Sequence, residues 1–382
     1  MKNKRYVYLL LLFVFLSCQT ETRYSSVHAY LNNLKQSQTK VGFPFLVDNN
    51  ISLPNISDDQ EVFYFEKSMN GDILYWFNGS DYTIKSVNVS TGNVDGVISF
   101  PQVSALTNQS FAKAALLDNQ TFIWYADSSL IHFCALNGIY QHTIQLQLEH
   151  QGKLYFISAT PHTHIEYFPT QNVIILPISC ADEYDDVELH QMPQFALYNL
   201  STESIQFISI HLPQLYPSDK YLGNLMFPIT AHDGNYFYAA YPLSSTIYKY
   251  NVTDGSIETI TLQLPVPLTS PTTMASPINY QQMGELEYLA NRINGLAVIN
   301  GIIFVQQTDA WDENLQSRNF IDNTILYAFD AQGGLTWSGA FPQDAFNNIG
   351  VFRLSFAHEG KLNILTFNKN NEQRFIQLRP QL

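Results

Sequence analysis

The sequence predicts an all-β fold and, within that class, a six-bladed β-propeller. Aromatic residues make up 14% of the chain, and aromatic and β-branched residues favour strands. Short apolar or alternating runs of strand length recur from residue 61 to the end, with turn pairs such as Asn78-Gly79 and Asn137-Gly138 between them. No helix longer than two turns is needed anywhere in this part of the chain.

The runs group into units of up to four strands, which is the size of a propeller blade. Six such units cover residues 62–100, 114–148, 153–212, 224–264, 289–341 and 348–378. A strand that enters a tight glycine turn recurs in them, for example at Ser90-Thr91-Gly92 and Thr253-Asp254-Gly255. Glycine accepts the positive φ that such turns require.

The number of units favours a closed ring. Six small sheets cannot each bury a face alone, but packed radially they cover one another and leave only short edges. A seven-bladed propeller and a pair of β-sandwiches are the alternatives. Because no linker or shift in composition interrupts residues 46–382, we expect this whole segment to be a single propeller domain.

The beginning of the chain has the order of a bacterial export signal. Three basic residues precede an apolar run over residues 6–16. This run is about half of the ~20 residues that a membrane-spanning helix needs. Residues 1–17 are therefore predicted to be a secretory signal peptide.

The cysteine that follows predicts a lipid anchor. Phe15-Leu16-Ser17-Cys18 resembles the lipobox of bacterial lipoproteins, in which the cysteine thiol receives a diacylglycerol, although leucine is commoner where Phe15 stands. The resemblance implies that Cys18 is lipidated, and a secreted protein with a free Cys18 is the alternative. Residues 18–45 then form the lipidated end and a polar spacer. Gln19, where an aspartate would favour the inner membrane, indicates the outer membrane.

Charge and cysteine content restrict the partners and the chemistry. The formal net charge is -14, and it becomes more negative when the basic signal peptide is removed. A domain this acidic, without a basic cluster, is a poor candidate for binding nucleic acid. Cys134 and Cys180 are too few for a disulfide framework. We expect buried free thiols, with one long-range disulfide as the alternative.

Together these features resemble a known family. The lipobox-like residues 15–18, the length, and hairpins such as 84–92 and 247–255 resemble the Bacteroidetes lipoproteins that form six-bladed, TolB-like propellers, in particular the DUF4221 family. The resemblance implies a propeller fold and an exported location. That family has no established activity to assign to residues here.

Two segments are candidate metal sites. His162 and His164 are two residues apart, so on a strand both side chains would point to one face and could share a metal. The acidic segment that contains Asp182, Asp185 and Asp186 could bind Ca²⁺ or another divalent ion, which takes several oxygen ligands. In both cases exposed loop residues without a metal are the alternative.

A third candidate site lies around a long loop. Residues 264–287 are rich in proline and resist both helix and interior strand, and long loops are often functional. Arg292, Asn294, Asp309 and Trp311 follow this loop. An aromatic residue beside carboxylates suits a sugar or a peptide, and an arginine suits a carboxylate. Plain loop packing is the alternative.

The sequence favours a non-catalytic binding module of the bacterial envelope, attached to the membrane through its lipid only. Its partner would be an envelope protein or a small ligand. The alternative is a metal-assisted hydrolase or lactonase that acts from the central channel. The sequence contains no nucleophile elbow, P-loop or zinc-protease motif, which is why binding is favoured.

Overall fold

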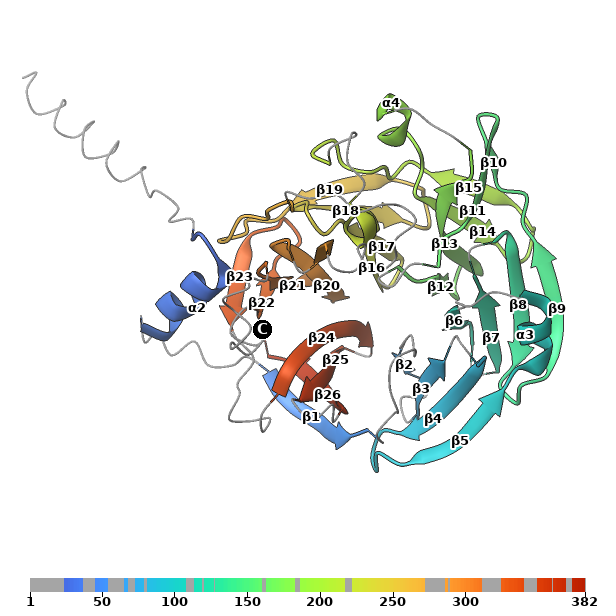
Figure 1. The fold of residues 1–382 in the computed structure, drawn as a ribbon, viewed down its shortest axis with the longest axis horizontal. Helices are drawn as coiled ribbons and strands as arrows, with labels where there is room; N and C mark the ends of the chain where they lie inside the picture. Colours follow the sequence, from blue (N-terminus) through green and yellow to red (C-terminus); the bar gives the residue numbers. More distant parts are fainter. Residues whose placement is uncertain are drawn as a thin grey trace, which may run out of the picture.

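The computed structural model shows a ring of antiparallel sheets around a central axis (Figure 1). It describes residues 24–36, 45–53, 65–67, 73–78, 81–107, 113–118, 120–126, 128–159, 163–182, 186–216, 222–271, 286–287, 289–310, 324–339, 349–358, 360–368 and 373–381. The described strands form six sheets, so the six-bladed propeller predicted from the sequence is confirmed.

The first three blades follow one another along the chain. Blade 1 comprises β2 (Phe65–Lys67), β3 (Ile73–Asn78), β4 (Thr83–Asn88) and β5 (Val94–Ser99). Blade 2 comprises β6 (Lys113–Leu116), β7 (Thr121–Tyr125), β8 (Leu130–Ala135) and β9 (Tyr140–Gln145). Blade 3 comprises β10 (Glu149–His150), β11 (Lys153–Ile157), β12 (Glu166–Phe168), β13 (Val173–Cys180), β14 (Phe195–Asn199) and β15 (Ile205–Ile208).

The other three blades complete the ring. Blade 4 comprises β16 (Ile229–Asp233), β17 (Tyr236–Ala240), β18 (Thr246–Asn251) and β19 (Ile257–Thr261). Blade 5 comprises β20 (Arg292–Ile299), β21 (Ile302–Thr308), β22 (Thr324–Phe329) and β23 (Leu335–Gly339). Blade 6 comprises β24 (Ile349–His358), β25 (Lys361–Asn368), β26 (Gln373–Pro380) and, as its outermost strand, β1 (Phe45–Ser52).

The ring is closed by pairing the two ends of the domain. Strand β1 pairs with β26, and the register shifts between Val47 and Asn49, which leaves Asp48 as an extra residue. Such an irregularity can redirect a side chain. The Asp48 carboxylate accepts Lys361 Nζ at 3.0 Å and Arg379 at 2.7 Å. Burial opposes ionisation of Asp48, but these two cations together lower its pKa below the usual value. The closure therefore combines a strand ladder with a small ionic cluster.

The tight turns of the sequence have the expected backbone. Gly92 in the β4–β5 turn and Gly255 in the β18–β19 turn have φ angles of 74° and 75°. A side chain at Gly92 would also meet the carbonyl oxygen of Ser52, because its Cβ would lie 2.7 Å from that atom. The prediction that glycine supplies a positive φ here is confirmed, and at Gly92 it also lets blade 1 approach blade 6 closely.

Side chains that pack between neighbouring sheets form the core. Between blades 1 and 2, Tyr75 meets Phe122 edge-on with ring centroids 5.0 Å apart, and Phe100 lies against Trp124. The side chains of Phe195 and Phe237 make the same kind of contact between blades 3 and 4. Each sheet therefore buries its two faces against its neighbours.

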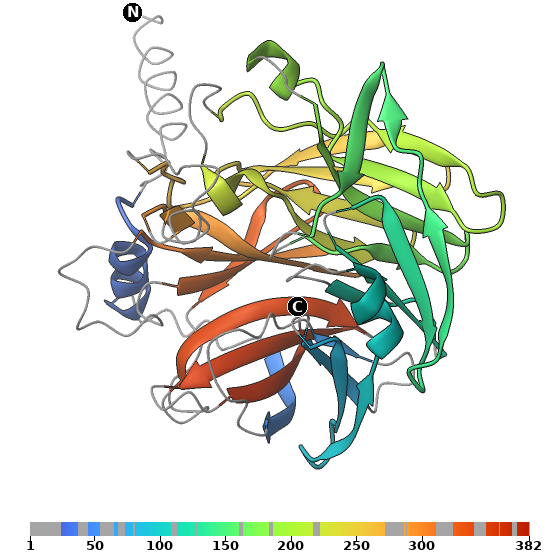
Figure 2. The same ribbon diagram turned by 45° about the vertical axis from the view of Figure 1, so that its right-hand side comes forward.

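The two faces of the ring differ in the length of their connections (Figure 2). In each blade the inner strand, which is the strand nearest the central axis, begins at one face of the ring and ends at the other. At the face where the inner strands end, short turns join the strands, such as residues 234–235 and 300–301. We call it the turn face. The long connections begin and end at the opposite face, which we call the loop face: 100–112 with α3 (Pro101–Thr107), 181–194 with α4 (Asp186–Leu189), 209–228 with η1 (Gly223–Met226), 262–291 and 309–323.

Helix α2 (Val27–Gln36) packs against the ring. Its residues Val27, Tyr30 and Leu31 are buried in the cluster between blades 4 and 5, and the Tyr30 hydroxyl lies 2.8 Å from the Ser338 hydroxyl. This segment falls within the predicted spacer 18–45, so part of that spacer lies on the domain. Among the helices of the described segments, none is both long and apolar enough to cross a membrane.

Candidate ligand-binding site

Polar side chains gather at the inner edges of blades 2, 3 and 4. In blade 3 the inner strand is split into β11 and β12, which pair with opposite ends of β13. The chain makes an excursion between them, of which residues 158–159 and 163–165 are described. Thr163, at the end of this excursion, is buried, and its hydroxyl donates to the carbonyl of Pro228 just before β16. The excursion thus connects blade 3 to blade 4 at the loop face.

A hydrogen-bonded chain runs through this region. Lys113, the first residue of β6, donates from Nζ to the carbonyl of Thr163 at 2.8 Å. The next residue, His164, donates its backbone N–H to the Thr230 hydroxyl at 3.3 Å. That hydroxyl donates to Glu166 Oε1 at 3.2 Å. The chain ends at His232, whose Nδ1 lies 2.7 Å from Glu166 Oε2. We call these five residues with Thr163 the inner polar cluster.

Burial differs sharply between the members of the inner polar cluster. The Glu166 side chain is 11% exposed, whereas that of His232 is 45% exposed. A buried carboxylate is costly unless it is hydrogen-bonded, and Glu166 accepts at both oxygens. Lys113 is also buried, with 3% of its surface exposed. The cluster therefore holds two charges of opposite sign in the wall and exposes an imidazole that is fixed by a carboxylate.

The fold is similar to those of two solved structures. A member of the DUF4221 family from Bacteroides vulgatus aligns with a TM-score of 0.56 and 13% identity, over 88% of this chain and 97% of its own. A Bacteroides fragilis protein described as a predicted exported protein aligns with a TM-score of 0.53 and 10% identity, over 89% and 96%. The chain has a DUF4221-like fold. No protein-family model and no curated protein matches the sequence.

The similarity to the DUF4221 propeller confirms the resemblance expected from the sequence, at the level of the fold. At 13% identity it assigns no ligand or activity to these residues.

Arg292 and Asn294, which the sequence analysis proposed as ligand-binding, lie on β20. The Arg292 guanidinium is 3.7 Å from Glu287 Oε2, and Glu287 Oε1 accepts the Asn224 amide at 2.6 Å. Both ionic side chains are largely buried. Asn294 is the extra residue of a β-bulge, because Ile293 and Gly295 pair with consecutive residues of β21. Glu287 thus joins η1 to the first residue of β20. The role of Arg292 in binding a ligand stays a prediction.

Asp309 is engaged by helix α2. Its carboxylate accepts the backbone N–H groups of Val27 at 2.8 Å and of His28 at 3.0 Å. Burial raises the pKa of Asp309 above the usual value, although the two N–H groups and His28 act in the opposite direction. Asp309 therefore caps the helix, which the sequence analysis did not anticipate. Trp311 lies outside the described residues.

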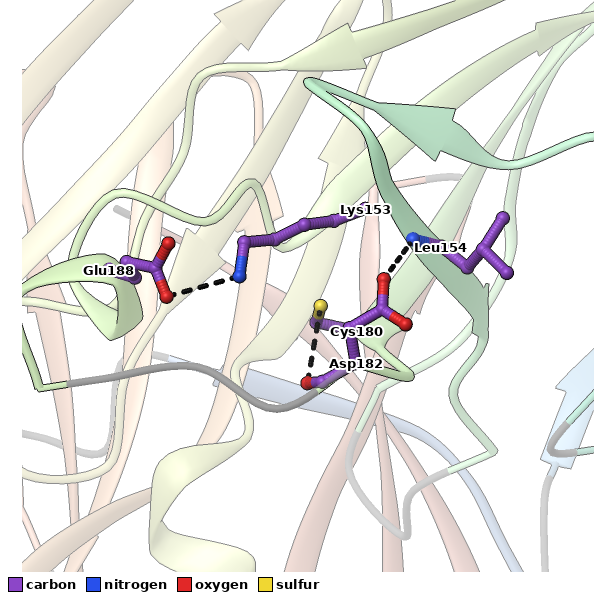
Figure 3. Close-up of polar contacts among 5 residues, drawn as sticks. All are labelled: Lys153, Leu154, Cys180, Asp182 and Glu188. Atoms are coloured by element: carbon purple, nitrogen blue, oxygen red, sulfur yellow. Dashed lines mark hydrogen bonds and ion pairs between the residues drawn. The ribbon is translucent and has the colours of Figure 1, made fainter.

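The candidate metal ligands are only partly described. His162 and Asp185 lie outside the described residues, and for Asp186 only the backbone at the start of α4 is described. Asp182 Oδ2 accepts the Leu154 N–H at 2.6 Å, and its carbonyl accepts the Cys180 thiol (Figure 3). Within the described segments, no three His, Cys, Asp or Glu side chains are grouped so that they could hold a metal ion.

The acidic loop also stabilises blade 3. Glu188 in α4 accepts Lys153 Nζ at 3.0 Å, and this bond raises the pKa of Lys153 (Figure 3). Together with the Asp182 contact, it fixes the loop to the first two residues of β11, Lys153 and Leu154. A structural role thus accounts for two of the acidic side chains, and divalent-ion binding by the others stays a prediction.

Proposed function

We propose that this chain is a lipid-anchored propeller of the bacterial envelope, held in the outer membrane through Cys18, that binds an envelope protein without chemical conversion. The loop face carries the binding surface, and the inner polar cluster leads from Lys113 at that face to His232 at the turn-face end of β16. The exported protein of Bacteroides fragilis with the same fold and the export signal at residues 1–17 support the location.

The observation that carries the proposal is the hydrogen-bonded chain from Lys113 to His232. It joins the inner strands of three blades through side chains and one loop. Such a network is rigid because each buried charge is satisfied within the protein. A rigid polar wall suits recognition, since little ordering is required when a partner binds.

Photo-crosslinking in intact cells tests this proposal. A photoreactive amino acid is placed either at Leu289 in the 262–291 connection, whose side chain is 45% exposed, or at Ile139 in the β8–β9 turn, which is 61% exposed. We expect one reproducible crosslinked partner from position 289 and none from position 139. The same crosslink should be weakened when Lys113→Met is added, because Lys113 begins β6 at the loop face. A crosslink that forms only at the turn face would contradict the proposal.

The pairing of His232 with Glu166 also supports a second candidate function, hydrolysis. A histidine held by a carboxylate is an arrangement that general bases use. Purified protein is therefore assayed with lactone and glycan substrates, with and without divalent ions. Turnover that disappears in both Glu166→Gln and His232→Ala would favour the enzyme and contradict a purely binding role.

A further inference from the structure

Helix α2 and the chain just before it determine where the membrane anchor leaves the propeller. Tyr24 donates its backbone N–H to the carbonyl of Pro265 at 3.2 Å. Its ring lies 4.8 Å from that of Tyr30, which is buried between blades 4 and 5. The chain therefore reaches the loop face already fixed at Tyr24, beside the 262–291 connection.

The remaining tether is short. Cys18 precedes Tyr24 by six residues, and a fully extended chain of that length spans at most ~20 Å. The propeller is about as thick as its strands are long, and the eight residues of β20 correspond to ~26 Å. A lipid on Cys18 thus keeps the loop face near the bilayer. The turn face lies too far from Tyr24 for this tether to bring it to the bilayer instead.

The surface beside the tether has a composition that suits a bilayer. Residues 262–271 contain no ionisable side chain, in a chain whose net charge is -14. Within this segment Pro267, Thr269 and Ser270 are exposed, and Leu264 and Leu268 are partly exposed. Prolines, hydroxyls and aliphatic side chains can approach lipid headgroups without the repulsion that carboxylates would meet at an anionic surface.

Among the described residues, three charged groups close to this segment, those of Glu287, Arg292 and Asp309, are engaged within the protein. Thr269 bridges to Asn291, and the following residue, Arg292, forms its ion pair with Glu287 where both side chains are largely buried. The Asp309 carboxylate is directed at the N-terminus of α2. The neutral surface is thus maintained although acidic and basic residues lie nearby.

From these observations we infer that residues 24–25 and 262–271, the anchor edge, contact the membrane that holds the lipid on Cys18. This inference rests on the lipid anchor of the proposed function. It adds that the loop face is turned toward the bilayer. A partner of that face must then be embedded in the membrane or lie at its surface.

Fluorescence quenching in vesicles tests the contact. The full lipidated chain is reconstituted into vesicles of phosphatidylethanolamine and phosphatidylglycerol that contain a lipid with a headgroup-proximal spin label. One fluorophore is attached at Ser270→Cys on the anchor edge or at Ser256→Cys in the β18–β19 turn of blade 4. Both serines are exposed, and both variants carry Cys180→Ser so that this partly exposed thiol is not labelled.

We expect strong quenching at position 270 and none at position 256. Asp309→Ala, which removes the cap of α2, should weaken the quenching at position 270, because release of the helix lengthens the tether. Equal quenching at the two positions, or stronger quenching at position 256, would overturn the inference.

Mass spectrometry of the N-terminal peptide distinguishes a missing lipid anchor from a missing contact of the anchor edge with the membrane. If the peptide lacks the diacylglycerol on Cys18, the anchoring part of the proposed function fails, and the inference fails with it. If the lipid is present and position 270 is not quenched, only the inference about the anchor edge fails.

Discussion

His232 Nδ1 lies 2.7 Å from Glu166 Oε2, and the two residues belong to the inner strands of adjacent blades. Glu166→Ala should therefore destabilise the ring, because Thr230 and His232 would both lose their acceptor. Removal of one partner from a buried hydrogen-bonded pair costs about 1–3 kcal/mol. Urea unfolding of the purified protein measures the change in the free energy of unfolding.

Glu258→Ala is the matched control for the loss of a carboxylate. Glu258 pairs with Lys249 at 3.1 Å, but its side chain is 66% exposed. Exposed ion pairs contribute at most about 1 kcal/mol, so this variant should remain close to the parent protein. Equal destabilisation by the two substitutions would show that Glu166 is not part of a buried network.

The fold could be predicted because its signals are local. In a strand such as β11, less buried and more buried residues alternate from Leu154 to Ile157. The turn after β18 contains Gly255 with the positive φ that the sequence indicates. These signals repeat from blade to blade, and a ring is the arrangement that buries all the sheets. The closing strand β1 was not among the predicted units, because its pairing with β26 joins opposite ends of the domain.

The inner polar cluster could not be predicted in the same way. Glu166 lies in a strand of three residues, which is too short to show alternation. Its partners Thr230 and His232 are 64 and 66 residues away. A lysine at the start of an apolar strand, as at Lys113, is a weak local signal of a buried charge. Only the order of the blades around the axis brings these residues together.

Asp309→Ala should release helix α2 from the ring. The substitution removes the acceptor of two N–H groups at the first turn of the helix, and loss of an N-terminal cap costs about 1 kcal/mol. Trypsin should then cut after Lys35 in α2 faster than in the parent protein, because cleavage follows the population of the open form. The rate of this cut is followed by mass spectrometry.

Asp309→Asn is the comparison for this helix cap. An amide keeps one oxygen acceptor and removes the charge whose burial raises the pKa of Asp309. We expect cleavage after Lys35 to remain nearer to the parent rate than in the alanine variant. Cleavage that is equally fast in the asparagine and alanine variants would indicate that the carboxylate charge itself holds the helix.

Stability should fall in mild acid because of His132. This side chain in β8 is 1% exposed, its Nδ1 lies 2.7 Å from the Thr143 hydroxyl, and burial lowers its pKa below the usual 6.5. The unfolded chain then takes up a proton at a higher pH than the folded one. The contribution of His132 to stability is complete above pH 6.5. This contribution is lost as the pH falls from 6.5 through the lowered pKa of His132. The free energy of unfolding then decreases by at most about 1.4 kcal/mol per pH unit.

Urea unfolding between pH 8 and pH 5 measures this loss. His132→Asn should flatten part of the profile, because the residue no longer titrates. His142→Asn, at an exposed position of β9 in the same blade, controls for the removal of a histidine. A profile that is identical in the parent and the His132→Asn protein would contradict the assignment.

The two thiols of the domain should differ in reactivity. Cys134 is buried in β8, and burial raises its pKa to about 12; Cys180, at the end of β13, is partly exposed. Since the thiolate is the reactive form, a disulfide exchange reagent at pH 8 should modify Cys180 but not Cys134 in the folded protein, and both in urea. Cys180→Ser should abolish the reaction of the folded protein. Absence of both reactions in urea, with recovery after reduction, would instead show that the two cysteines form the long-range disulfide that the sequence left open.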